Sequence, residues 1–281
     1  MTNLNIQTSS GFLSTDRRDR WWIEPLWTGL GFLAFVVYTT WAMLQGNYYW
    51  WSAFQEGFGG YLSPFYSPLF FIKQGVEGVA PLNHAWFGSW PGWWPSLIPA
   101  TPAILILAGP LSFRMTCYYY RKFYYRAYFL TPPACAVSGT PRKKYKGETA
   151  LFVFQNLHRY TLYIAIAIIV ILTYDGIMSL FRGGTFGVGI GSIILLINPV
   201  LLAGYTFGCH AFRHLVGGNK DCLTCPHGSP TIRYRLWKGV SMLNGRHMFW
   251  AWTSMVWVAF SDIYVRMVSS GQWIDLNTWE F

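Results

Sequence analysis

The sequence holds five cysteines and six histidines, and several of them stand in short groups. His210 and His214 are four residues apart, so on a helix their rings lie on one face and can share one metal ion. Cys222 and Cys225 form a Cys-x-x-Cys pair, which can hold an iron through two thiolates. Two cysteines with two histidines are the ligands of a Rieske-type [2Fe-2S] cluster. The donors for such a cluster are therefore present, although not in the usual Cys-x-His and Cys-x-x-His order.

Each of these residues also has a simpler interpretation. A single cysteine such as Cys117 is typical of a small buried hydrophobic side chain. A histidine at a helix end, such as His158 or His247, can cap carbonyl groups or meet lipid headgroups. Cys222 and Cys225 could hold a structural zinc ion together with a nearby histidine.

The composition indicates the environment in which these residues work. Hydrophobic residues make up 53% of the 281 residues and charged residues only 11%, whereas soluble domains carry about 25% charged residues. Aromatic residues make up 20%, and such side chains gather at membrane interfaces. These numbers predict an integral membrane protein and argue against a soluble domain, a disordered chain or a disulfide scaffold.

Five apolar runs are long enough to cross a bilayer, which needs roughly 20 residues per helix. We therefore expect an all-α integral membrane protein, a bundle of about five transmembrane helices that forms one domain over residues 22–268. The expected spans are residues 22–44, 97–118, 158–181, 187–215 and 246–268. The remaining segments are a polar N-terminus without a signal peptide (1–21), a Trp-rich outer loop lying on the bilayer (47–95), inner loops (119–157 and 216–245) and an outer tail (269–281).

The basic residues predict the orientation of these spans. Eighteen of the 21 lysines and arginines fall in the N-terminus and in residues 114–159 and 213–246, which are the two inner loops with the span ends beside them. Because basic loops stay on the cytoplasmic side, the N-terminus is expected inside and the C-terminus outside. The basic run at residues 142–146 could also attract anionic lipid or an acidic partner. No basic stripe outside these loops suggests nucleic-acid binding.

With this orientation, all five cysteines and five of the six histidines lie on the cytoplasmic side, and only His84 lies outside. That compartment is reducing, so metal or redox chemistry is favoured over disulfides. The candidate pool for two Cys and two His ligands consists of Cys117, Cys135, Cys209, His210, His214, Cys222 and Cys225.

Two acidic residues lie deep in the apolar runs. Asp175 and Asp262 are both about 25 Å from the inner face at ~1.5 Å per helical residue. Buried carboxylates of this kind commonly belong to proton paths or ligand pockets. They could instead form ion pairs with Arg182 and Arg266.

Five strings of residues resemble a known family over about residues 100–270. They are RMTCYYYRK (114–122), PPACAV (132–137), QNLHRY (155–160), CHAFRH (209–214) and LNGRHM (243–248). The chain resembles the large, cytochrome b-like membrane-anchor subunit of mycobacterial-type succinate dehydrogenase, a succinate:menaquinone oxidoreductase of the bacterial cell membrane.

The resemblance implies a complex with two partners. A flavoprotein with FAD oxidises succinate, an iron-sulfur protein with further clusters relays the electrons, and the anchor passes them to menaquinone. It also implies a membrane-embedded Rieske-type [2Fe-2S] cluster in place of haem. The resemblance favours Cys117, Cys135 and Cys209 as ligands, whereas spacing alone favours Cys222 and Cys225; His210 and His214 are expected in either case.

Placement near this cluster suggests where quinone binds. We expect it among His158, Tyr160, Trp237, Arg246 and His247. Quinone reduction takes up two protons, which a nearby histidine or tyrosine can donate. Asp175 and Asp262 are candidates for a proton path or for a second, outer quinone site.

Three competing functions remain. A haem-b anchor would use two histidines from different helices, for instance His158 and His214. A membrane di-iron desaturase or hydroxylase is less favoured, because it needs about eight ligands and this chain has six histidines. The third is a scaffold with a zinc-bound loop. The oligomeric state, including a higher oligomer, stays open.

Overall fold

The computed structural model describes residues 11–52, 60–140, 149–218 and 232–279. The helices are α1 (Ile23–Gln45), α2 (Pro102–Met115), α3 (Tyr118–Phe123), α4 (Thr149–Met178), α5 (Ile190–Phe207), α6 (His210–Gly217), α7 (Ile232–Gly245) and α8 (His247–Ser269), with a 3-10 turn η1 (Leu82–His84) and a π-helical turn η2 (Tyr124–Tyr128). Two antiparallel hairpins complete the described chain: β1 (Trp50–Trp51) with β2 (Tyr61–Leu62), and β3 (Phe181–Arg182) with β4 (Thr185–Phe186).

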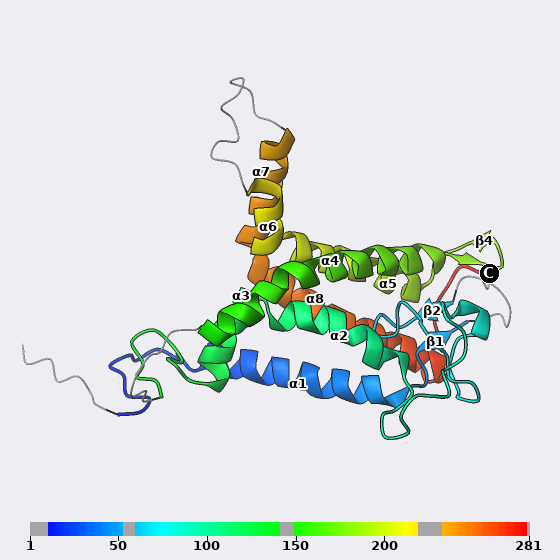
Figure 1. Cartoon of the computed structure of the whole chain (residues 1–281), viewed down its shortest axis with the longest axis horizontal. Coiled ribbons are helices and arrows are strands. Elements are labelled where there is room, and N and C mark those ends of the chain that lie inside the picture. The colour runs from blue at the N-terminus through cyan, green and yellow to red at the C-terminus, as the bar shows by residue number, and fades with distance from the viewer. Residues whose placement is uncertain (1–10, 53–59, 141–148, 219–231, 280–281) are drawn as a thin grey trace, which may run out of the picture.

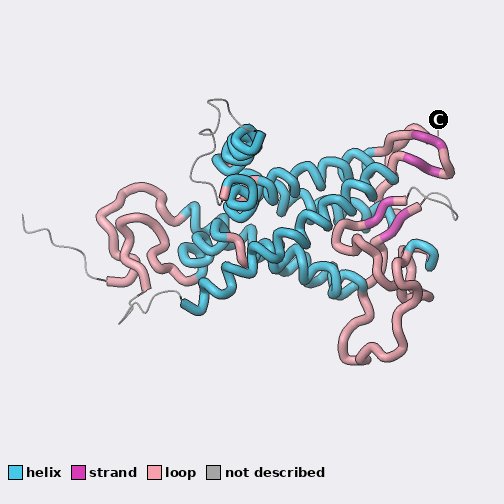
Figure 2. Tube along the Cα trace, turned by 45° about the horizontal axis from the view of Figure 1, so that its top comes forward, coloured by secondary structure: helices cyan, strands magenta, loops and turns pink. Residues whose placement is uncertain are grey.

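Five helices form an elongated bundle: α1, α2, α4, α5 and α8 run side by side along its long axis (Figure 1). The N-terminal residues and α3 lie at one end, and the hairpins and the C-terminus lie at the other. Helices α6 and α7 pack on each other and project across the bundle axis, as both views show (Figure 2). The expected all-α membrane fold is confirmed.

Three described helices are long and apolar enough to cross a membrane by length and composition: Ile23–Gln45, Asn156–Met178 and Ile190–Phe207. Helix α2 is apolar but shorter. Helix α8 has 23 residues, and it carries Asp262 and Arg266 inside its apolar run. The count of five spans therefore stays a prediction.

The apolar run at 187–215, expected as one span, is divided into two helices. Helix α5 ends at Phe207, and α6 begins at His210 in a new direction. Cys209 lies between them in an extended conformation, and its Sγ accepts a hydrogen bond from the Phe212 N–H. The sulfur thus caps the first turn of α6, a backbone break that hydropathy does not register.

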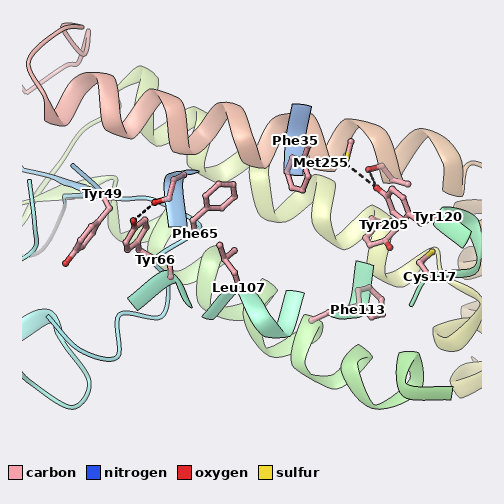
Figure 3. Packing of buried hydrophobic residues seen from close by; sticks show 14 of the residues in the cluster. Phe35, Tyr49, Phe65, Tyr66, Leu107, Phe113, Cys117, Tyr120, Tyr205 and Met255 are labelled. Atoms are coloured by element: carbon pink, nitrogen blue, oxygen red, sulfur yellow. Dashed lines mark hydrogen bonds between the residues drawn. The ribbon is translucent and has the colours of Figure 1, made fainter. Parts of the chain in front are cut away.

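The outer loop also differs from the expected surface segment. Tyr49, Tyr61, Phe65 and Tyr66 are buried, and several of these rings are visible in the core (Figure 3). The Tyr49 and Tyr66 rings stack with centroids 4.2 Å apart. The described part of the loop therefore packs its large aromatic side chains into the end of the bundle that is expected to face outside, which we call the outer end.

Two buried ion pairs tie this loop and the C-terminal tail to the helices. Arg266 Nε lies 2.7 Å from Asp262 Oδ2, and the Tyr38 hydroxyl donates to the same oxygen at 2.6 Å. Arg182 Nη2 lies 3.3 Å from Asp275 Oδ2, and the Tyr61 hydroxyl donates a hydrogen bond to the same oxygen at 2.8 Å. Asp262 therefore has the ion-pair partner that the sequence left as an alternative.

We expect the substitution Asp262→Asn to destabilise the protein. Removing one partner of a buried pair leaves an uncompensated charge, here on Arg266, at a cost of about 3–5 kcal/mol. Thermal unfolding of the purified protein measures the loss. The exposed substitution Glu77→Gln serves as control, and an unchanged melting temperature in Asp262→Asn would contradict the prediction.

Candidate functional site

A cavity of about 200 Å³ lies where the α2/α3, α5/α6 and α7/α8 junctions meet α4. We call it the thiol-imidazole cavity, because its lining includes Cys117, His158, Cys209, His210 and His247. Cys117 lies between α2 and α3, and His158 lies near the start of the apolar part of α4. Cys209 and His210 begin α6, and His247 begins α8. Residues far apart in the sequence thus share one small space.

The backbone breaks aim the two thiols inward. Cys117 is in an extended conformation at the junction of α2 and α3, and Cys209 is extended at the junction of α5 and α6. Their residues are 2% and 1% exposed. Figure 3 shows Cys117 among the buried rings, close to Tyr205 and Phe113.

The imidazoles are oriented by hydrogen bonds and ring contacts. His158 Nδ1 lies 3.0 Å from the Phe113 carbonyl oxygen, which can only accept, so this nitrogen carries the proton and Nε2 keeps its lone pair. His247 Nε2 lies 3.5 Å from Cys117 Sγ, and its ring stacks on Tyr205. His247 Nδ1 is buried without a hydrogen-bond partner among the described residues.

Both thiols are buried in the bundle. A metal that binds here must displace the thiol protons, because the thiolate is the ligand. As the side chains stand, no three His, Cys, Asp or Glu residues in the described ranges are close enough to hold one metal ion.

Other members of the expected ligand pool lie elsewhere. Cys135 is exposed, and its carbonyl accepts a hydrogen bond from Arg17 at 2.8 Å. His214 does not line the thiol-imidazole cavity. Cys222 and Cys225 fall outside the described residues. The structure therefore brings together Cys117, Cys209 and His210 from that pool.

A second hollow, which we call the basic groove, adjoins the cavity. It measures about 510 Å³, shares His158 and His210 with the cavity, and is also lined by Arg159, Arg213, His214 and Trp237. Two other residues expected at a quinone site, Tyr160 and Arg246, are exposed and line neither hollow. The expected quinone residues are thus divided between the cavity, the groove and the surface.

Asp175 lies at the far end of the bundle, in an outer cavity of about 570 Å³. The lining includes Trp50, Ser67, His84, Trp86, Tyr174 and Asp175. The Ser67 hydroxyl donates to the Asp175 carboxylate. Burial lowers the pKa of His84, so its imidazole is neutral at physiological pH. Sequence reasoning did not connect His84 with Asp175, because they are 91 positions apart in the chain.

Sequence reasoning placed His158 and His247 on the same side as the cysteines but assigned them to the quinone site rather than to the metal ligands, and it missed Arg114. Arg114 is buried in α2 beside this site, and in the sequence it is only the first residue of one of the five strings that carry the resemblance. The one sequence property shared by Cys117, His158, Cys209 and His247 is a position at the inner end of an apolar run.

Comparison with known proteins identifies the family. The model of the family described as actinobacterial succinate dehydrogenase subunit SdhC matches residues 23–271. The chain is also similar to a chain of a solved structure described as the Mycobacterium smegmatis Sdh1 complex in the apo form. The two are 40% identical with a TM-score of 0.79, over 96% of this chain and 99% of that chain. None of the curated proteins compared with it matches. With its apolar helices, the chain therefore belongs to the actinobacterial SdhC family, the multi-pass membrane-anchor subunits of succinate dehydrogenase.

Proposed function

We propose that this anchor passes electrons to menaquinone through a Rieske-type [2Fe-2S] cluster held in the thiol-imidazole cavity. The electrons would come from an iron-sulfur subunit docked on the basic inner face, which in turn receives them from a flavoprotein subunit with FAD. The observation that carries the proposal is the meeting of two buried cysteines with three histidines in one cavity.

The donor set fits the cluster in number and chemistry. Cys117 and Cys209 would supply the two thiolates, and two of His158, His210 and His247 would supply the imidazoles, which is the Rieske ligand set. When bound, the cluster would accept and donate one electron at a time. At about 200 Å³ the cavity is smaller than the roughly 300–1,000 Å³ of ordinary ligand pockets, so it suits a compact inorganic group better than a haem.

Local contacts prepare the ligands. A metal-bound histidine usually donates its other ring N–H to a backbone carbonyl, as His158 does to Phe113. The Phe212 N–H at the start of α6 would stabilise a Cys209 thiolate through its hydrogen bond to Sγ. His247 Nδ1 is buried and has no hydrogen-bond partner among the described residues, so the His247 ring could bind an iron through either nitrogen.

We expect Cys117→Ser and Cys209→Ser each to remove the cluster, because both thiolates are needed on one iron. Cys135→Ser is the matched control, since Cys135 is exposed and does not line the cavity. EPR of the dithionite-reduced complex, with iron and acid-labile sulfide analysis, measures the cluster. Single alanine variants of the three histidines identify the two imidazole ligands.

Three outcomes would contradict this assignment. If Cys222→Ser loses the EPR signal and Cys117→Ser keeps it, the thiolate ligands come from the 216–245 loop instead. A haem-b spectrum in the pyridine haemochrome assay would replace the cluster with haem. Zinc without iron or sulfide would indicate a structural site.

We further propose that the quinone ring binds in the basic groove beside the cavity. The groove shares His158 and His210 with the cavity, so a bound ring would lie next to the proposed cluster. Trp237 forms an aromatic wall of the groove, with the Arg213 guanidinium 4.9 Å from the centre of its ring, and His214 can relay protons to the reduced quinone. Arg159 and Arg213 can stabilise negative charge on the quinone oxygens.

Trp237→Ala is expected to lower quinone reduction at least about tenfold and to raise the KM for quinone, because the groove loses its aromatic wall. The reduced EPR signal and succinate oxidation with an artificial acceptor should not change. Tyr160→Phe is the control, since Tyr160 is exposed and lies outside the groove. If wild type and Trp237→Ala reduce quinone with equal kinetics, the basic groove is not the quinone site.

For the outer cavity we propose a second quinone site or a proton path to one, with Asp175 as the proton-handling group. A positioned acid contributes typically 10²–10⁴-fold to a rate. Asp175→Asn should therefore lower quinone reduction by at least about tenfold without altering the EPR signal. Tyr163→Phe is the control, since Tyr163 is exposed on the same helix and does not line the outer cavity. Normal quinone reduction in Asp175→Asn would contradict this role for Asp175. Asp262, the other acidic candidate, forms an ion pair with Arg266, which favours a structural role for Asp262.

A further inference from the structure

Three arginines are buried among the residues that the structure describes, and they are not equivalent. Arg182 and Arg266 each form an ion pair with an aspartate at the outer end of the bundle. Arg114 is 7% exposed and forms no ion pair with any described residue. An arginine keeps its charge in proteins, and an uncompensated buried charge is strongly unfavourable. Something else must therefore balance Arg114.

Neutral groups satisfy the hydrogen bonds of Arg114 but not its charge. Its Nη1 donates to the Tyr120 hydroxyl at 2.7 Å and to the Ala251 carbonyl oxygen at 3.0 Å. Its Nη2 donates to the Ser254 hydroxyl at 3.1 Å. The guanidinium carbon lies 4.7 Å from the centre of the Tyr205 ring. These contacts hold the guanidinium in one position without neutralising its positive charge.

The thiol-imidazole cavity lies directly beyond the Tyr205 ring. That ring stacks on His247, with centroids 5.0 Å apart, and His247 Nε2 lies 3.5 Å from Cys117 Sγ. The Cys117 N–H also donates to the Arg114 carbonyl at 3.2 Å. The pair of cysteines, with any group that they would hold, is therefore a place close to Arg114 where negative charge can accumulate.

We propose that Arg114 is the built-in counter-charge of the redox group in the thiol-imidazole cavity and raises its reduction potential. This inference rests on the proposed cluster. Each electron that enters the site adds one negative charge, and a fixed cation in a low-dielectric interior stabilises the reduced form. Arg114 is a positioning and tuning residue: it acts through its electric field across Tyr205, and it lines neither the basic groove nor the thiol-imidazole cavity.

The test is an EPR-monitored redox titration of the complete complex. Arg114→Gln keeps a polar side chain and removes the charge, so it should shift the reduction equilibrium at least tenfold toward the oxidised form, or about 59 mV to lower potential for one electron. Arg114→Lys keeps the charge and should restore most of the potential. Ser254→Ala removes one hydrogen bond but no charge, so the potential should stay unchanged.

A second pair of variants tests the charge without removing the arginine. Ser254→Asp places a carboxylate beside the guanidinium and should lower the potential as Arg114→Gln does. Ser254→Asn, of the same size and neutral, should leave it unchanged. This pair decides the question if Arg114→Gln fails to assemble.

The outcomes separate the two proposals. Absence of a Rieske-like signal in the wild-type complex overturns the proposed cluster. An intact signal whose midpoint potential is the same in wild type and Ser254→Asp, or in wild type and Arg114→Gln, overturns the role of Arg114 alone. An equal shift in Ser254→Asp and Ser254→Asn also overturns it, because the effect would then be one of packing rather than of charge.

Discussion

The guanidinium of Arg114 joins the helices that build the inner end of the bundle. It extends from α2, donates to Tyr120 of α3 and to Ser254 of α8, and lies over the ring of Tyr205 of α5. A buried arginine has five N–H groups in a rigid fork, so its partners must hold fixed positions around it. The positions of Cys117, one turn further along the chain, and of His247, stacked on Tyr205, follow from this arrangement.

The two ends of the bundle solve the same physical problem in opposite ways. At the outer end each buried arginine has an aspartate partner, and tyrosine hydroxyls donate to both carboxylates. At the inner end the Arg114 cation has only neutral partners among the described residues, and a cavity with two thiols lies next to it. A paired charge favours a single rigid structure, whereas an unpaired charge favours binding of an anionic group.

Much of the fold could be predicted from local properties of the chain. The apolar runs, the Trp and Tyr content and the distribution of basic residues depend on short segments, and these predicted a helical membrane protein with its termini at opposite ends. The break at Cys209 could not be predicted in this way, because the residues around it are as apolar as those of a continuous span. The burial of Tyr49, Tyr61 and Tyr66 could not be predicted either, because an aromatic residue suits a membrane interface as well as a protein core.

The sequence by itself determined which donors are available and on which side of the membrane they are expected, because residue type and basic-residue asymmetry are properties of the chain. It placed His158 and His247 on the same side as the cysteines, but it could not separate Cys117 and Cys209 from Cys135 as their neighbours. Only the tertiary structure decided this, because proximity depends on how the helix junctions at Cys117, Cys209 and His247 converge on α4. The same holds for charge balance: Arg114, Arg182 and Arg266 look alike in sequence, and only the packing shows that Arg114 alone among these three has no acidic partner in the described chain.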